Sequence, residues 1–127
     1  MELLATRHED VVVIGVAGRI DHMNAEAFKS GIATHVEACR SGGDRVLFDL
    51  ANLEYISSAG LRVLMVASKS TKPVGGEIAV AAPQPVVREI LDITRFNLVF
   101  PIYDSVDDGL RAFAETAAAQ RTQQKDQ

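Results

Sequence analysis

The chain has 127 residues, 47% of them hydrophobic, which is enough for one core that needs neither disulfides nor a metal. Its formal net charge of −4 at pH 7 argues against a nucleic-acid partner, whose surface requires clustered Lys and Arg. No apolar run approaches the roughly 20 residues of a membrane span, and the first residues lack the basic and apolar regions of a signal peptide. With its single cysteine, Cys39, the sequence predicts a cytoplasmic protein without a membrane span.

The first half of the sequence predicts two buried strands separated by a helix. The apolar run 11–17 is rich in β-branched residues, which favour a strand buried on both faces. Over 24–39, apolar residues recur every three or four positions, and this spacing indicates an amphipathic helix. The apolar run 45–50 predicts the second buried strand, and we expect 51–56 to be a short loop.

The second half predicts a helix, a strand and a further helix. Because apolar residues occupy much of the circumference of the helix predicted over 57–69, we expect it to be largely buried. A strand is predicted over 77–82, and the next helix should begin at the prolines 83 and 85, where proline costs no hydrogen bond. The expected inner face of that helix consists of Val86, Ile90, Leu91 and Ile93.

The end of the chain predicts a short last strand over 97–102 and a final helix with Ser105 as its N-cap. From Thr116 onward no large apolar residue occurs, so we expect a domain over 1–115 and a flexible tail over 116–127. The strand, helix and strand within 45–82 have the order of a βαβ unit. The predicted fold class is therefore α/β, one domain with a mixed sheet.

The sequence lacks the residue patterns of common catalytic, cofactor-binding and metal sites. The histidines, His8, His22 and His35, do not pair at helical spacing with one another or with a cysteine. The segment 56–60, Ile-Ser-Ser-Ala-Gly, differs from the Gly-x-Ser-x-Gly elbow of serine hydrolases, and no Gly-x-x-x-x-Gly-Lys-Ser/Thr phosphate loop occurs. We therefore expect no enzyme activity, no cofactor and no metal.

Two adjacent serines, Ser57 and Ser58, fall at the start of the predicted helix over 57–69. One serine is enough to cap the helix, a role worth about 1 kcal/mol. The other would lie exposed on the first turn, beside free backbone N–H groups that can donate hydrogen bonds to a phosphate. Spacing alone favours two serines that serve only the helix end, and it permits a phosphorylation site here without requiring one.

The segment 46–64, Val-Leu-Phe-Asp-Leu-Ala-Asn-Leu-Glu-Tyr-Ile-Ser-Ser-Ala-Gly-Leu-Arg-Val-Leu, resembles the STAS domains of bacterial anti-sigma factor antagonists. Gly-Arg-Ile-Asp at 18–21 is similar to the turn before the family's first helix, and Gly-Gly-Glu at 75–77 is similar to a turn into a later strand. Val-Val-Arg-Glu-Ile-Leu at 86–91 and the following Phe96 resemble the third helix and its end. This resemblance covers about 8–114 and implies a STAS fold, with a mixed sheet of four to five strands and about four helices.

The family resemblance also implies a function and a site. It identifies Ser58 as the phosphorylated serine; Ser57 is the rival because the family often has Asp there, and Ala59 stands where the family often has Ser or Thr. The unphosphorylated protein would bind an anti-sigma factor that is also a serine kinase of the HATPase type, phosphorylation would release it, and a PP2C-type phosphatase would reverse the change. The expected partner-binding residues are Asp21, His22, Asn24, Asn52, Glu54, Ser57, Ser58 and Arg62.

Two other functions remain open at the level of the sequence. The chain could be a STAS subunit of a lipid-transport ABC complex, or a partner-switching protein whose output is not a sigma factor. A kinase and phosphatase encoded nearby would favour the switch, whereas a permease and ATPase would favour the transport complex.

Overall fold

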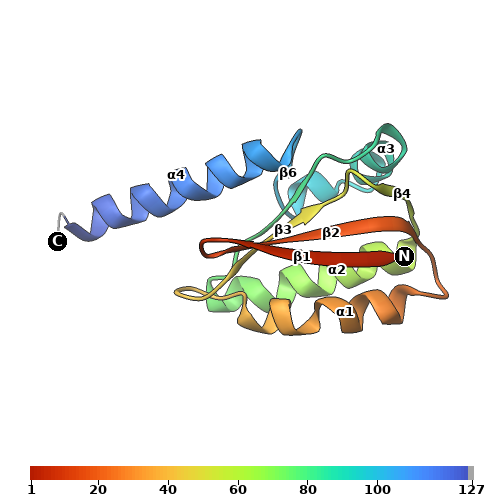
Figure 1. Ribbon diagram of the computed structural model, residues 1–127, viewed down its shortest axis with the longest axis horizontal. Helices are drawn as coiled ribbons and strands as arrows, with labels where there is room; N and C mark the ends of the chain where they lie inside the picture. The colour runs from red at the N-terminus through yellow and green to blue at the C-terminus, as the bar shows by residue number, and fades with distance from the viewer. Residues whose placement is uncertain (126–127) are drawn as a thin grey trace.

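The computed structural model describes the backbone of residues 1–125 and the side chains of residues 1–117. Within this part of the chain, one mixed sheet has the strand order β1-β2-β3-β5-β6, and β4 pairs with β2 (Figure 1). β1 runs antiparallel to β2, and the other pairs are parallel, which confirms the predicted α/β class and the mixed sheet. The strands are β1 (Glu2–His8), β2 (Val11–Ile20), β3 (Arg45–Asp49), β4 (Leu53–Ile56), β5 (Ile78–Ala81) and β6 (Ile102–Tyr103).

The helices form layers on the two faces of the sheet. The α-helices of the described chain are α1 (Ala25–Ala38), α2 (Ser58–Thr71), α3 (Pro85–Ile93) and α4 (Val106–Lys125), with short 3₁₀ turns at Lys72–Val74 and Phe96–Leu98. In Figure 1, α1 and α2 lie side by side below the sheet, whereas α4 lies on the other side and extends past the sheet. The four α-helices within these residues agree with the expected number.

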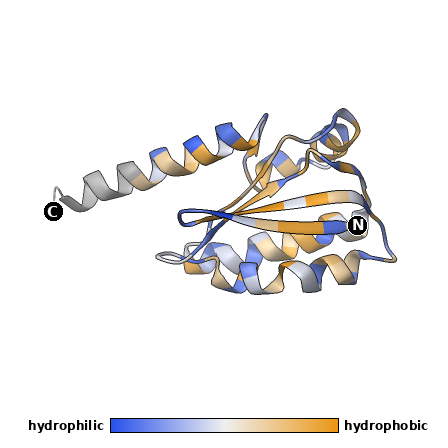
Figure 2. Ribbon diagram, in the orientation of Figure 1, coloured by the Kyte–Doolittle hydropathy of each residue, from blue (hydrophilic) through white to orange (hydrophobic). Residues whose placement is uncertain are grey.

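Successive side chains of β2 point to opposite faces of the sheet and pack against the helices on each face. Ile14 points into the larger core beneath α1 and α2, where it joins Phe28 and Phe48. Val13 points to the opposite face and packs in a smaller cluster with Phe113 of α4. Figure 2 shows strongly hydrophobic residues along β2, and the prediction of a central strand buried on both faces is confirmed for its first half.

Three strand assignments from the sequence were wrong. β1 was not predicted, because all of its residues except Leu3 are exposed and no apolar alternation marks it. The expected loop over 51–56 contains β4, a strand of four residues. The expected last strand over 97–102 is replaced by a 3₁₀ turn at Phe96–Leu98, and β6 has only two residues, Ile102 and Tyr103.

Two helix faces also differ from the prediction. In α3 the buried residues are Val87 and Leu91, whereas Val86 and Ile93 are 56% and 73% exposed. The helix therefore turns one of its two apolar stripes outward. In α2, Leu64 is buried as expected, but Val66 is 51% exposed. The outer face of α2 is open to solvent, since Ser58, Arg62 and Val66 are all exposed.

The start of α4 agrees with the prediction, because the Ser105 hydroxyl accepts a hydrogen bond from the Asp108 N–H at 3.1 Å. The helical backbone continues through Lys125, beyond the expected domain end at 115. The flexibility predicted for 116–127 stays a prediction, and residues 126–127 lie outside the described part of the chain.

Candidate functional site

The predicted site lies where the parallel strands β2 and β4 end and α2 begins. The Ser57 N–H donates a hydrogen bond to the Ile20 carbonyl at 2.8 Å, and the strand register pairs Ile20 with Ile56. The turn between β2 and α1 therefore lies beside the first turn of α2, although these segments are far apart in the sequence. Ligands of parallel sheets bind at such carboxyl ends of strands.

Gly60 allows the first turn of α2 to approach both strand ends. A Cβ at this position would lie 2.6 Å from Ile20 Cγ2 and 2.8 Å from Ile56 Cγ1, well inside normal carbon–carbon contact. Both isoleucines are buried and cannot move aside easily. The glycine therefore sets how closely α2 docks, and with it the position of the two serines before it.

The two serines occupy different environments. Ser57 is the N-cap of α2, and its hydroxyl oxygen accepts a hydrogen bond from the Gly60 N–H at 3.3 Å. Ser58 is the first residue of the helix, and its side chain is exposed. The capping role that the sequence left open between them belongs to Ser57, so the Ser58 hydroxyl is the one that faces solvent.

Asp21 and Asn24 shape the turn between β2 and α1 through reciprocal hydrogen bonds. The Asn24 Oδ1 accepts from the Asp21 N–H at 2.9 Å, and the Asp21 Oδ1 accepts from the N–H groups of Asn24 at 3.1 Å and Met23 at 2.9 Å. The Asn24 Nδ2 donates to the Arg19 carbonyl at 2.8 Å. These two residues therefore fix the turn, and the residues between them point outward.

The turn presents His22 and Met23 to solvent, and Met23 is 84% exposed. Met23 was not predicted from the sequence, because one methionine among polar residues carries no signal of its own. Nor was a contact between β2 and β4 predicted, where the Arg19 guanidinium lies 4.7 Å from the centre of the Tyr55 ring. That contact depends on the pairing of β2 with β4, and the residues of β4 had been predicted as part of a loop.

Asn52 lies apart from the other predicted site residues. Its carbonyl accepts a hydrogen bond from the Gly18 N–H at 3.0 Å, at the start of β4. Ser57 follows the other end of β4, and four strand residues span about 13 Å. Glu54 is exposed between the two ends. The structure therefore brings the β2–α1 turn together with α2, while Asn52 lies at the far end of β4.

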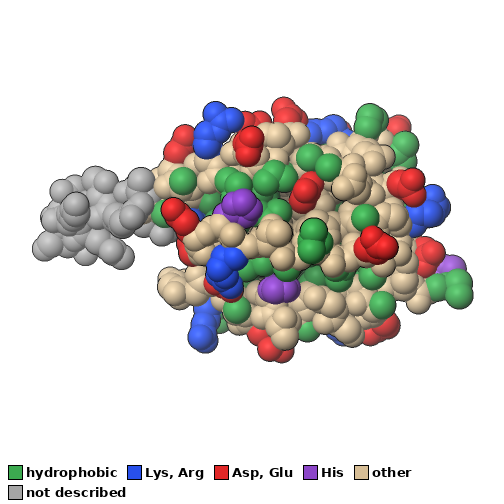
Figure 3. All heavy atoms as spheres, in the orientation of Figure 1, with side chains coloured by type: hydrophobic (Ala, Val, Ile, Leu, Met, Phe, Trp, Pro, Cys, Tyr) green, Lys and Arg blue, Asp and Glu red, His purple; other side chains and the backbone are tan. Residues whose placement is uncertain are grey.

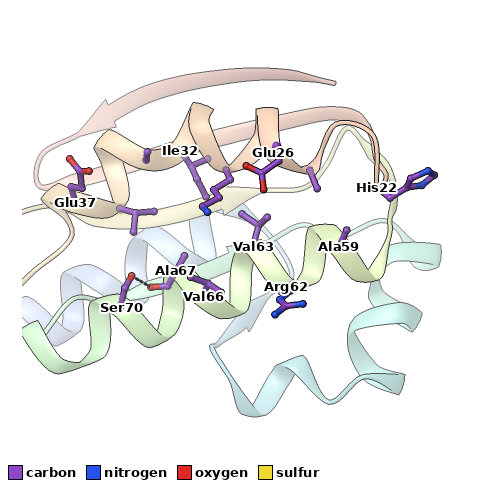
Figure 4. A pocket seen from close by; sticks show the side chains of 14 residues that line it. His22, Glu26, Ile32, Glu37, Ala59, Arg62, Val63, Val66, Ala67 and Ser70 are labelled. Atoms are coloured by element: carbon purple, nitrogen blue, oxygen red, sulfur yellow. Dashed lines mark hydrogen bonds between the residues drawn. The ribbon is translucent and has the colours of Figure 1, made fainter.

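Arg62 is exposed on α2, at the rim of a groove of about 510 Å³ between α1 and α2 (Figure 4). The groove begins at His22 and Ala59, beside the predicted site, and runs along both helices to Ser70. In Figure 4 the Arg62 side chain lies on the side of α2 that faces away from α1. Ile32 and Val63 lie between the helices and supply part of the apolar lining.

The charged residues of the site differ from those at the opposite ends of the strands. Among the described residues, no ion pair involves Asp21, Glu54 or Arg62. At the other end, the Arg45 guanidinium hydrogen-bonded to Asp10 holds the pKa of that carboxyl below its ordinary value. Figure 3 shows acidic and basic side chains intermixed over the visible face, without a large patch of one sign.

The described residues contain neither a metal-binding cluster nor a helix suited to a membrane. No group of three or more His, Cys, Asp or Glu side chains there could hold a metal ion. No described helix combines the length and apolar character needed to cross a bilayer. Cys39 is buried, and this burial raises the pKa of its thiol, which disfavours the reactive thiolate.

The family model for the STAS domain matches residues 2–109, which is most of the chain. The protein therefore belongs to the STAS domain family, as the segment 46–64 indicated. The match begins at the first residue of β1 and extends into the first turn of α4, so it includes both strands, β1 and β4, that were not predicted from the sequence.

The most informative curated relative is a Bordetella bronchiseptica protein named "Putative anti-sigma factor antagonist BtrV". It is 34% identical over 113 residues, which cover 89% of this chain and 95% of the relative. The crystal structure of an anti-sigma factor antagonist from Mycobacterium paratuberculosis has a TM-score of 0.76 and 29% identity, over 87% of this chain and 92% of that one. Unphosphorylated SpoIIAA, an anti-sigma factor antagonist, has a TM-score of 0.71 at 16% identity, over 90% and 97% of the two chains, and supports the fold alone.

Proposed function

We propose that this protein is an anti-sigma factor antagonist that binds an anti-sigma factor when Ser58 is unmodified and releases it when Ser58 is phosphorylated. The relatives named above support the class of function. The observation that carries the choice of residue is the difference between the two serines. Ser57 caps α2 with its hydroxyl, whereas Ser58 is exposed on the first turn.

The proposed partner is an anti-sigma factor that is also a serine kinase of the HATPase type. The kinase transfers the γ-phosphoryl group of ATP to the Ser58 oxygen, ADP leaves, and the hydroxyl proton passes to a base of the kinase. A PP2C-type phosphatase hydrolyses the ester and restores the hydroxyl. The antagonist contributes a surface and an acceptor, so it acts by binding in the cytoplasm and needs no cofactor of its own.

The proposed surface consists of the β2–α1 turn and the first turns of α2. Asp21 and Asn24 hold that turn in shape, and His22 and Met23 are its exposed residues. Such a preformed surface loses little conformational entropy on binding. Glu54 and Arg62 add exposed charges of opposite sign nearby, and unpaired charges of this kind favour recognition of a partner with complementary charges.

Phosphorylation changes the charge at the centre of this surface. A phosphoserine adds about 1.5 to 2 negative charges at neutral pH. In a complex that buries Ser58, the phosphate would have to lose most of its hydrating water, which is costly for a charged group. Changing the complex from 99% bound to 99% free requires about 5.5 kcal/mol, which repulsion and desolvation together can supply.

The test compares substitutions at the two serines for phosphorylation and binding. With ATP and the co-purified kinase, mass mapping should find one phosphoryl group on Ser58 in the native protein and in Ser57→Ala, and none in Ser58→Ala. Ser58→Ala should still bind the kinase, whereas Ser58→Glu should bind at least tenfold more weakly. Equal binding by Ser58→Ala and Ser58→Glu, or a phosphoryl group found on Ser57, would contradict the proposal.

A further inference from the structure

Ser58 and Arg62 lie on the same outer stripe of α2. They are four residues apart, which places them one above the other on the helix surface. Both are exposed, whereas Leu61 and Leu64 on the opposite face are buried. Helical side chains lean toward the N-terminus of their helix, so the longer side chain of Arg62 leans toward Ser58.

Arg62 makes no ion pair with any described residue. Four other arginines of the described chain each pair with an aspartate at 2.7–2.9 Å. Glu26 and Glu37 line the same groove as Arg62, and neither pairs with it. In Figure 4 the Arg62 side chain lies away from α1, the helix that carries both glutamates. Its guanidinium group is therefore available to a new anion on its own helix.

We propose that Arg62 binds the phosphate of phosphorylated Ser58 within the same chain. This inference rests on the proposed function, because it requires that Ser58 is the modified residue. A guanidinium group has two parallel N–H donors that match two phosphate oxygens, and such charge-assisted bonds are stronger than neutral ones. An arginine four residues after the serine can reach the phosphate without any change in the helical backbone.

The internal contact gives phosphorylation a second effect on the partner. In the unmodified protein Arg62 is free to bind an acidic group of the anti-sigma factor at the rim of the groove. In the phosphorylated protein the same guanidinium is held by the phosphate. Phosphorylation then adds negative charge to the surface and also removes a positive charge that the partner uses.

Lys29 is the competing cation, because it lines the same groove from α1. It would bind the phosphate from a neighbouring helix. Lys69 lies eleven residues after Ser58 on α2, about 16 Å along the helix axis, and is a matched control for loss of one positive charge.

The experiment uses the full chain with phosphoserine incorporated at position 58 during translation, so that no kinase is needed. The second ionisation of the phosphate is titrated by ³¹P NMR. An ion pair favours the dianion, so Arg62→Gln should raise the pKa of the phosphate by about half a unit, while Arg62→Lys should raise it less. Lys69→Gln should leave it unchanged.

An unchanged phosphate pKa in Arg62→Gln, or a larger rise in Lys29→Gln than in Arg62→Gln, would overturn the inference. If the contact exists, the Arg62 Nε–H signal should shift when Ser58 is phosphorylated. An unshifted Nε–H signal therefore also contradicts the inference. Failure of this inference and failure of the proposed function give different results. If the phosphate pKa depends on Arg62 but no kinase modifies Ser58, the contact stands and the proposed switch fails.

Discussion

The two ends of the parallel strands are built differently. At the end where β2 and β3 begin, Arg45 donates two hydrogen bonds to Asp10 at 2.9 and 3.0 Å and a third to the Phe113 carbonyl at 2.6 Å. Arg7 pairs with Asp44 in the same region. At the opposite end, the predicted site contains exposed polar and charged side chains without internal ion pairs. One end uses ion pairs to hold the fold together, whereas the charged residues of the other end form no ion pair within the described chain.

This difference predicts that substitutions at one end change stability and those at the other change binding. Arg45→Met should have the largest effect on stability, about 2 kcal/mol in urea unfolding, because three hydrogen bonds and the contact with the Phe113 ring are lost. Phosphorylation of Ser58 should continue at the native rate in this variant. Arg62→Gln is the control, with a change in stability within about 0.5 kcal/mol. Equal stability of the two variants would remove the distinction between the ends.

Gly60→Ala tests the close packing of α2 against the ends of β2 and β4. The new methyl group would meet Ile20 and Ile56, and this overpacking should destabilise the protein by about 1 to 2 kcal/mol, after the gain in helix propensity. It should also move the first turn of α2 and slow phosphorylation of Ser58. Gly15→Ala is the control, since its nearest contact would be at an ordinary 3.6 Å from the Leu4 carbonyl. If Gly60→Ala keeps the native stability and the native rate of phosphorylation, the prediction is contradicted, because α2 would then tolerate a displacement from the strand ends.

Ser57→Ala removes the N-cap of α2 and should lower the unfolding free energy by about 1 kcal/mol. Ser58→Ala removes an exposed hydroxyl and should change stability by less than about 0.5 kcal/mol, while abolishing phosphorylation. Thermal unfolding of the two variants in parallel separates the structural serine from the proposed functional one. A larger loss of stability in Ser58→Ala than in Ser57→Ala would reverse their roles.

The smallest predicted effect is on the stability of the fold at acidic pH. Because Arg45 lowers the pKa of Asp10 in the folded state, the unfolded state takes up a proton more readily, and the pair stabilises the fold above the ordinary carboxyl pKa. That stabilisation is lost as the pH falls through the lower folded-state pKa. The Asp10 side chain is half exposed, so the contribution should be a few tenths of a kcal/mol. Urea unfolding of Asp10→Asn between pH 3 and 6 should show a flatter dependence than the native protein, and identical curves would contradict this expectation.

The parts of the fold with strong hydrophobic patterns were predictable from the sequence. The apolar run in β2, the spacing in α1 and the strand–helix–strand order of β3, α2 and β5 carry their own signal. β1 and β4 do not, because β1 is almost entirely exposed and β4 has only four residues. Their pairing with β2 is a tertiary effect that no local pattern encodes.

The candidate site was predictable mainly through the Ser-Ser-Ala-Gly segment and its family resemblance. The separate environments of Ser57 and Ser58 required the structure, because adjacent serines are equivalent in a pattern. Met23 was missed for a similar reason, since its exposure depends on the hydrogen bonds between Asp21 and Asn24. Val86 and Ile93 of α3 were assigned to the core because helical spacing alone does not say which of two apolar stripes faces inward.

The pairing of β4 has a consequence for hydrogen exchange. Residues 11–15 of β2 pair with β3, and the last three residues of β2 pair with Leu53, Tyr55 and Ile56 of β4. Breaking the few bonds of β4 leaves the ladder of β1, β2, β3, β5 and β6 intact. We therefore expect the amides around Ser57 to exchange through local opening, well before those of β3. Such an opening would free the segment that precedes α2, while the rest of the sheet stays folded.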